Sequence, residues 1–335
     1  MLITHHLSVN FYVATTWIEI GVSRMPQTTN YESIITLISN PRLCGYQNTF
    51  KTTNDSELYG IYIWAQHAAA SLYPLLQNLE ISLRNAIDRE AKARFGLYWW
   101  DQIGKNVQGD TLPKFLVNID KAKRTLEIER RKKEARRKSP LDPFIQNQWT
   151  HDQILAATDF STWHFILSND FCSLSPKDNA NYLWPKSLGK VFRNYSSITP
   201  NSKYARKEIG DLIFELREYR NRLFHHEPVW NKAPNVSDAR SAIDTIRMKI
   251  NKIERLVNSL DKGLLTILYK VGLFDNARRV CSLDELNIYR YTKPYCTMTD
   301  AQHSLLDEYC QIADLKNETV IWEYKNNVFG LNKIR

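Results

Sequence analysis

A stripe of apolar residues at helical spacing constrains the fold of this chain more than any other feature. Apolar residues recur there at steps of three and four positions, and the stripe comprises Leu72, Leu75, Leu76, Leu79, Leu83, Ala86 and Ile87. Such steps put side chains on one face of an α-helix, whereas a strand requires alternation. A polar stretch, Lys51–Ser56, offers N-cap residues, and Gly96 suits a helix end. We therefore expect a long helical region that ends near Phe95–Gly96, with Pro74 kinking it or starting its second half.

Several other segments have helical character, and few residues favour turns. Glycine and proline number only 11 and 12 in 335 residues, which favours long helices over a many-turned β protein. Within one segment Ile243, Ile246, Ile250, Ile253 and Val257 are in helical register. The expected helices are Glu32–Ser39 (stopped by Asn40-Pro41), Lys114–Lys138, Asp152–Leu167, Ser187–Tyr195, Lys203–His226 and Ser237–Leu260. The prediction is an all-α bundle with long core helices and a mixed C-terminal region, in which Tyr289–Tyr295 is a candidate for extended structure.

The same patterns suggest three parts of the chain. Residues 1–29 are expected to be an extension, residues 30–260 a helical domain that includes the basic helix 114–138, and residues 261–335 a C-terminal accessory region. The apolar stretch Ser8–Val22 contains Glu19, is too short to span a membrane, and lacks the charged start of a signal peptide. Five scattered cysteines without a CxxC pair indicate neither a zinc site nor a disulfide framework. These features predict a cytoplasmic protein without membrane association.

The segment ELREYRNRLFHHEPVWN, residues 215–231, carries the strongest candidate for chemistry. At about 100° per residue its apolar side chains form one stripe, and Arg220 falls inside it. A guanidinium on a core-facing side needs an anionic partner or a cleft, because burying it alone is costly. His226 lies at the edge of the stripe, and Asn221 and His225 share another face. Because Pro228 disfavours helical geometry before it, the helix should end near Glu227, with both histidines in its last turn.

These residue types suit phosphodiester cleavage in RNA. Attack by the 2′-hydroxyl needs a base, the leaving 5′-oxygen needs an acid, and histidine can serve as either. Arginine clamps phosphate oxygens with two donors, and Asn221 can orient an imidazole or a ribose hydroxyl. The scheme requires no metal or cofactor, and two copies across a two-fold axis would form a composite site in a homodimer. A surface polar string, or an Arg220 ion pair with a structural glutamate, would explain the same residues.

At this point the chain resembles the Abi-like proteins of bacterial abortive infection, which belong to the HEPN superfamily of helical ribonucleases. The HEPN signature is Arg, four to six residues, then His, often with a polar residue after the Arg. Arg220-Asn221 through His225 fits it, and His226 is a second match. Further similar pieces are Pro41-Arg42-Leu43, Leu58-Tyr59 to Trp64, the run Leu79 to Ile87, and His225-His226-Glu227-Pro228-Val229-Trp230-Asn231. The resemblance covers roughly residues 30–260.

The resemblance implies a HEPN fold, dimerisation, metal-independent endoribonuclease activity, and a role in phage defence by growth arrest, in some systems with an antitoxin or a small RNA. It assigns catalysis to Arg220 and His225, with Asn221 at the polar position and His226 in support. Glu80 and Arg84 lie one helical turn apart and can pair, and Glu80 is a candidate partner for Arg220 or a catalytic histidine. Glu80, Arg84 and Asn85 would equally serve as a polar network that holds the fold.

A basic run lies at residues 121–138, in a chain whose formal net charge is +9. Its candidate RNA-binding residues are Lys121, Lys123, Arg124, Arg130, Arg131, Lys132, Lys133, Arg136, Arg137 and Lys138. Closely spaced cations can follow phosphates, although a solvated helix with exposed pairs to Glu127, Glu129 and Glu134 is the simpler interpretation. Trp99, Trp100, Trp149 and Trp163 could stack bases or belong to the core.

Three functions therefore compete: an RNA-cleaving enzyme, a non-catalytic RNA-binding module that uses the basic helix, and a regulatory scaffold that binds other proteins. The first predicts cleavage lost on changing Arg220 or His225. The second predicts salt-sensitive RNA binding without products and a structural role for Arg220. Retention of both signature residues argues against the third.

Overall fold

The computed structural model describes residues 20–22, 30–107, 111–136, 149–230, 236–290, 294–296, 304, 306–315, 319–324 and 327–331. The chain forms two compact units, Thr29–Arg290 and a smaller one made of Met1–Thr28 with Tyr291–Arg335. The described residues contain fourteen α-helices and four short strands, so the all-α prediction is confirmed. Among them no helix is long and apolar enough to cross a membrane.

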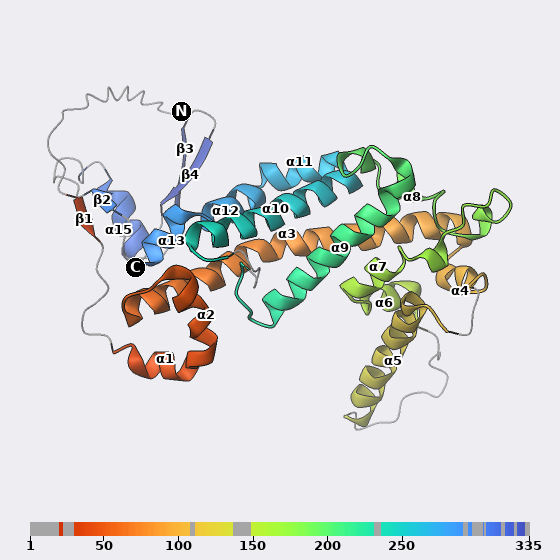
Figure 1. Ribbon diagram of the computed structural model, residues 1–335, viewed down its shortest axis with the longest axis horizontal. Coiled ribbons are helices and arrows are strands. Elements are labelled where there is room, and N and C mark those ends of the chain that lie inside the picture. Colours follow the sequence, from red (N-terminus) through yellow and green to blue (C-terminus); the bar gives the residue numbers. More distant parts are fainter. Residues whose placement is uncertain are drawn as a thin grey trace, which may run out of the picture. The chain divides into compact units, whose positions relative to one another are not determined.

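Helix α3 (Asp55–Phe95) is the axis of the larger unit (Figure 1). With 41 residues it is roughly 60 Å long. The Asn54 side chain caps its first turn, and Gly96 ends it with a φ of 87°. The helix continues through Pro74, whose carbonyl accepts a 2.8 Å hydrogen bond from Asn78 Nδ2. The leucines of the predicted stripe are all buried, which confirms the long helix and its core face.

Five C-terminal helices complete the main bundle on α3. Helices α10 (Ala239–Leu260), α12 (Leu273–Val280) and α13 (Leu283–Tyr289) contact α3 directly, while α9 (Ser202–Phe224) and α11 (Lys262–Lys270) pack on α10. The isoleucines predicted to face the core from α10 are all buried. The compact unit thus runs to Arg290, beyond the boundary at residue 260 that the sequence suggested.

The N-terminal part of the larger unit differs from the expectation at Asn40-Pro41. Helix α1 (Glu32–Ile38) ends as predicted, but a second helix, α2 (Asn40–Phe50), begins at once. Ser39 takes a φ of 82° between the two helices. Proline is tolerated in the first turn of a helix, where its missing N–H has no partner in any case. The same proline therefore ends one helix and starts the next.

The remaining helices gather around the C-terminal part of α3. Their bounds are α4 (Trp99–Gly104), α5 (Lys114–Ala135), α6 (His151–Ala156), α7 (Phe160–Phe165), α8 (Leu188–Val191) and the 3-10 turns η1 (Asn169–Phe171), η2 (Asn179–Asn181) and η3 (Tyr195–Ser197). The predicted helix Asp152–Leu167 is wrong as a single element, because Asp159 interrupts it. Its carboxylate caps α7 by accepting the Thr162 N–H at 3.2 Å, and such side-chain bonds favour a new helix start.

The smaller unit contains two antiparallel strand pairs and one helix. Strand β1 (Ile20–Val22) pairs with β2 (Pro294–Cys296), and β3 (Val320–Tyr324) pairs with β4 (Asn327–Leu331). Helix α15 (Asp307–Leu315) lies against β3 and β4. Part of the extended structure expected at Tyr289–Tyr295 is thus strand β2. The expectation of an N-terminal extension falls mostly outside the described residues.

Candidate active site at the end of helix α9

The end of α9 is a hydrogen-bonded turn that holds both candidate histidines. The His226 N–H donates to the Leu223 carbonyl at 3.1 Å, and the Glu227 N–H donates to the Arg222 carbonyl at 3.0 Å. This pattern is the Schellman motif, in which one left-handed residue ends the helix. His226 takes that position with a φ of 57°, where glycine is usual. Both imidazoles are exposed, and His225 is the C-cap, so the helix ends earlier than the expected Glu227.

Arg220 lies one turn before this motif, on the side of α9 that faces α3. Its Nη2 atom lies 3.6 Å from Glu80 Oε2, and its guanidinium carbon lies 4.3 Å from the ring centroid of Phe224. The side chain keeps 30% of its surface exposed. The ion-pair distance exceeds that of a hydrogen bond, so the guanidinium donors are not consumed by Glu80. Arg220 thus has the anionic partner that its place in the apolar stripe requires.

A cavity of about 190 Å³ lies beside Arg220, so the guanidinium has a cleft in addition to its anionic partner Glu80. Three segments of the chain line it: α3, the connection from α6 into α7, and α9. Its lining residues are Tyr73, Leu76, Gln77, Glu80, Ile81, Arg84, Thr158, Trp163, Arg220 and Phe224. The rings of Tyr73 and Phe224 are 5.6 Å apart, and both are nearly half exposed. The candidate arginine therefore lines a hollow with carboxylate, amide and aromatic side chains.

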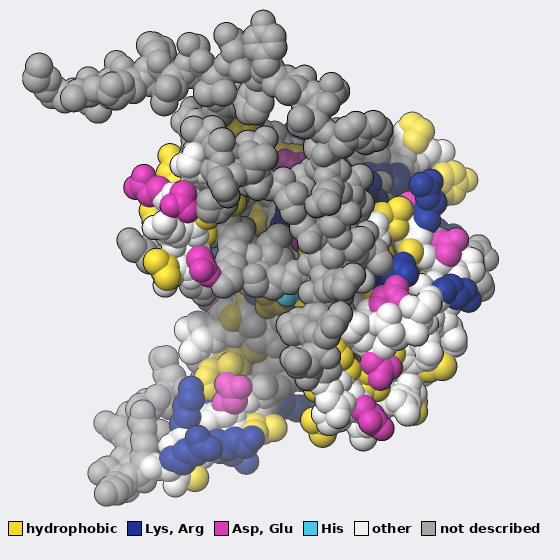
Figure 2. All heavy atoms as spheres, turned by 90° about the vertical axis from the view of Figure 1, so that its left-hand side faces the viewer, with side chains coloured by type: hydrophobic (Ala, Val, Ile, Leu, Met, Phe, Trp, Pro, Cys, Tyr) yellow, Lys and Arg dark blue, Asp and Glu magenta, His cyan; other side chains and the backbone are white. Residues whose placement is uncertain are grey.

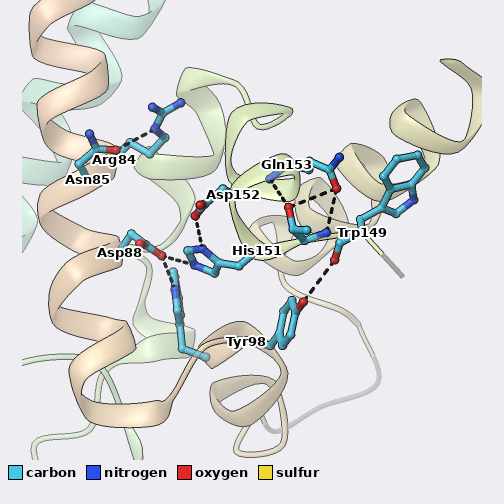
Figure 3. A network of polar contacts seen from close by, with 10 residues as sticks. Arg84, Asn85, Asp88, Tyr98, Trp149, His151, Asp152 and Gln153 are labelled. Carbon is cyan, nitrogen blue, oxygen red and sulfur yellow. Dashed lines mark hydrogen bonds and ion pairs between the residues drawn. The ribbon is translucent and has the colours of Figure 1, made fainter. Parts of the chain in front are cut away.

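Glu80 is the acidic group of this cavity. Burial raises the pKa of its carboxyl above the ordinary value, opposed by Arg220 and reinforced by the nearby carboxylate of Asp159. Arg84, which the spacing offered as a partner for Glu80, instead donates from Nε to Asn85 Oδ1 at 3.1 Å (Figure 3). Glu80 therefore reaches across to α9, whereas Arg84 and Asn85 form a contact within α3.

Asn221 is half-buried on a different side of α9 from Arg220. Its carbonyl accepts the N–H of His225 at 3.0 Å, as the four-residue spacing implies for a helix. The backbones of these two residues are therefore held together by the last full turn of α9.

A second cavity, of about 620 Å³, adjoins His226. Arg42 of α2 is part of its wall and donates from Nη1 to the carbonyl of His226 at 2.7 Å. The ring of Trp230 packs edge-on against Tyr46 and Phe50, at centroid distances of 4.9 and 4.8 Å. The segment after the histidines is therefore fixed on α2. The sequence pointed to Arg42 only as part of the piece Pro41-Arg42-Leu43.

Helix α5 carries most of the basic run, and Lys and Arg side chains gather at the lower left of Figure 2, at the height of α5 in Figure 1. Part of the charge is neutralised within the helix. Glu127 accepts hydrogen bonds from Arg130 at 2.8 Å and Arg131 at 2.9 Å, and these bonds lower the pKa of Glu127 to about 2. Arg130 also binds Glu134. Six of the other candidates are described, namely Lys121, Lys123, Arg124, Lys132, Lys133 and Arg136, whereas Arg137 and Lys138 lie outside the described residues.

A buried polar network that the sequence did not reveal lies between α3, α4 and α6 (Figure 3). Asp88 Oδ1 accepts from Trp99 Nε1 at 2.8 Å and lies 2.8 Å from Nε2 of His151. The other ring nitrogen of His151 lies 2.9 Å from Asp152, and this contact lowers the pKa of Asp152. Trp100 stacks on the imidazole at 5.1 Å. This network fixes α4 and α6 on α3.

The tryptophans weighed as base-stacking residues mostly belong to the core. Trp99, Trp100 and Trp163 are buried, and Trp149 is half-buried. A buried ring cannot present its face to a base in solution, so these three side chains support the fold, and Trp163 also lines the cavity beside Arg220.

Another polar contact joins His164 of α7 to Arg217 of α9. Burial, with Arg217 as the next cause, lowers the pKa of His164 to about 4. Nη1 of Arg217 lies 3.4 Å from His164 Nδ1, and its guanidinium also binds Glu218. The imidazole is therefore neutral at pH 7, with Nδ1 as the acceptor because arginine can only donate.

In the described part of the chain, no group of three or more His, Cys, Asp or Glu side chains is arranged to hold a metal ion. Comparison of the sequence with protein-family models, and of the chain with curated proteins and with solved structures, found no match.

Proposed function

We propose that this chain is a metal-independent endoribonuclease of the HEPN type that acts on RNA through Arg220, Asn221, His225 and His226. One observation carries the proposal. The same end of α9 presents a guanidinium at a cavity and, directly after it, two exposed imidazoles in a left-handed turn. The resemblance to Abi-like proteins adds the expectation of a growth-arresting role in phage defence.

The proposed chemistry divides among these groups. One histidine removes the proton of the ribose 2′-hydroxyl, and a histidine in the acid form protonates the leaving 5′-oxygen. Arg220 binds the phosphate oxygens as negative charge builds up on phosphorus. Either His225 or His226 can take the leading part, since both are exposed.

Glu80 positions the guanidinium in this scheme. Its 3.6 Å contact holds Arg220 at the cavity without using the donors that would meet a phosphate. A purely structural ion pair would use the same two residues. Replacing Arg220 by lysine distinguishes the positioning role from the structural one. Lysine keeps the charge that pairs with Glu80 but lacks the two-pronged donor geometry for a phosphate.

The proposed active unit is a homodimer. One α9 supplies one arginine and two adjacent histidines, and a two-fold axis near the helix ends would bring a second set to the same RNA linkage. The proposal includes an antitoxin or a small RNA as a neutralising partner, which the resemblance alone suggests.

The test is cleavage of total RNA by the purified chain in EDTA, with analysis of fragment ends. The proposal expects 2′,3′-cyclic phosphate ends, and it expects Arg220→Ala or His225→Ala to slow cleavage by about 100-fold or more. His67→Ala is the matched control, because His67 is an exposed histidine of α3 outside the cavity.

Arg220→Lys separates catalysis from folding. Its free energy of unfolding should stay within about 1 kcal/mol of the parent's, because lysine keeps a positive charge beside Glu80. Its cleavage should be poor, because lysine lacks the two-pronged donor geometry. Full cleavage by Arg220→Lys together with Arg220→Ala, or a strict Mg²⁺ requirement, would contradict the proposal. Salt-sensitive RNA binding without products would instead favour a binding module based on the cations of α5.

A further inference from the structure

We infer that the cavity beside Arg220 binds a single nucleobase of the RNA, stacked on the ring pair of Tyr73 and Phe224. The inference rests on the proposed function, and it goes further by assigning a base-recognition site to residues outside the Arg-His motif. The protein would then recognise the base of the nucleotide next to the scissile phosphate.

The exposure of the two rings is the first argument. Tyr73 is 47% and Phe224 46% exposed, although both lie at the wall of a cavity whose floor includes the buried Trp163. Their centroids are 5.6 Å apart and their planes are tilted by 57°, so a base stacked on one ring would meet the other ring at its edge. Aromatic side chains left open in this way offer a face to any base, since every base has a π-face.

The size and lining of the cavity point to a base rather than a larger ligand. Its volume of about 190 Å³ is below the roughly 300 Å³ at which sites for drug-sized ligands begin. Leu76 and Ile81 provide apolar walls, while Gln77 adds an amide that can both donate and accept. The apolar walls and the amide suit the face and the polar edge of a base, while Arg220 in the same lining suits the phosphate attached to it.

The position of Arg220 connects this site to the scissile bond. Its guanidinium lies over the ring of Phe224 at 4.3 Å, so one side chain borders both the aromatic surface and the proposed phosphate site. A nucleotide with its base in the cavity would have its phosphate within reach of Arg220. The contact between Arg220 and the Phe224 ring therefore places the proposed base site next to the proposed phosphate site.

Binding is measured with an RNA octamer that is 2′-O-methylated throughout, so that it cannot be cut, and carries one 2-aminopurine as a fluorescent base. The parent chain should quench the probe on stacking. Tyr73→Ala should weaken binding about tenfold, the usual effect of removing one stacking ring. Tyr73→Phe keeps the ring and should restore binding. Tyr204→Ala is the matched control, because Tyr204 is 49% exposed and lies at the opposite end of α9.

Base preference is measured by sequencing the ends of cleaved RNA. Gln77→Leu should change the base favoured beside the cut. The variant should stay folded, because Gln77 lies within a helix and leucine is also a helix former. Equal probe binding by the parent and Tyr73→Ala, with an unchanged preference in Gln77→Leu, would overturn the inference and leave the proposed cleavage intact. If probe binding depends on Tyr73 but the chain cuts no RNA, the base site would stand and the proposed cleavage would be contradicted. Competition by nucleoside monophosphates at the affinity of the octamer would also overturn it, because the ligand would then be a free nucleotide.

Discussion

Replacing His226 by glycine tests whether the end of α9 stores backbone strain. His226 has a φ of 57°, and a side chain in this left-handed region costs roughly 1–2 kcal/mol. Glycine removes that cost but loses about 0.4–1 kcal/mol through the greater freedom of the unfolded chain. The net expectation is that His226→Gly raises the free energy of unfolding by about 0.8 kcal/mol, the difference between the midpoints of these two ranges. The same change removes an imidazole from the proposed site, so cleavage should fall as stability rises.

The measurement is urea unfolding at equilibrium, with His226→Ala as the companion variant. Alanine also removes the imidazole but keeps the Cβ atom, so the difference between the two variants reports the strain relieved by glycine less the entropy that glycine adds to the unfolded chain. Lys51→Gly is the matched control, because Lys51 ends α2 in the same left-handed region with a φ of 53° and lies outside the cavity beside Arg220. It should gain similar stability without losing cleavage. Equal unfolding midpoints for His226→Gly and His226→Ala would refute the strain argument.

Two further predictions concern the buried polar contacts near the site. Asp88→Ala should lower the free energy of unfolding by about 3 kcal/mol, because it leaves Trp99 Nε1 and the buried His151 without their hydrogen-bond partner. Urea unfolding measures this loss. An effect no larger than that of Asp101→Ala, at an exposed aspartate, would refute the prediction. The folded chain binds a proton at His164 only near pH 4, whereas the unfolded chain binds it near pH 6.5, so stability should be lost as pH falls through this window. His164→Gln should remove that part of the loss between pH 7 and 4.5, and identical pH profiles would contradict the assignment.

The sequence predicted the long helices because their stability comes from one continuous apolar face. In α3 and α10 the leucine and isoleucine stripes alone specify the buried side, and both stripes are buried as expected. The short helices were predicted less well. Asn40-Pro41 both ends α1 and starts α2, and Asp159 divides a predicted helix by capping α7. Such choices depend on one side chain and its local hydrogen bonds, which periodicity does not report.

Residues of the candidate site could be predicted where a local rule is broken. Arg220 stood out because a cation occupied an apolar stripe, and this required a partner such as Glu80. The contact of Arg42 with the His226 carbonyl joins residues 184 positions apart, and no pattern within either segment encodes it. The buried pair of Asp88 and His151 could not be predicted for the same reason, since each residue alone looks like a polar side chain that faces solvent.

Two departures from local rules meet at the end of α9, and together they weigh against a purely structural interpretation. A surface polar string would not place histidine where glycine ends a helix at lower cost, nor bring Arg220 into an apolar stripe where it needs Glu80 to offset its charge. Either departure alone could follow from packing. Both occur within seven consecutive residues, 220–226, beside a cavity with exposed aromatic rings. Because folded proteins concentrate such exceptions at functional sites, the combination favours chemistry at this end of α9 over a role in stability.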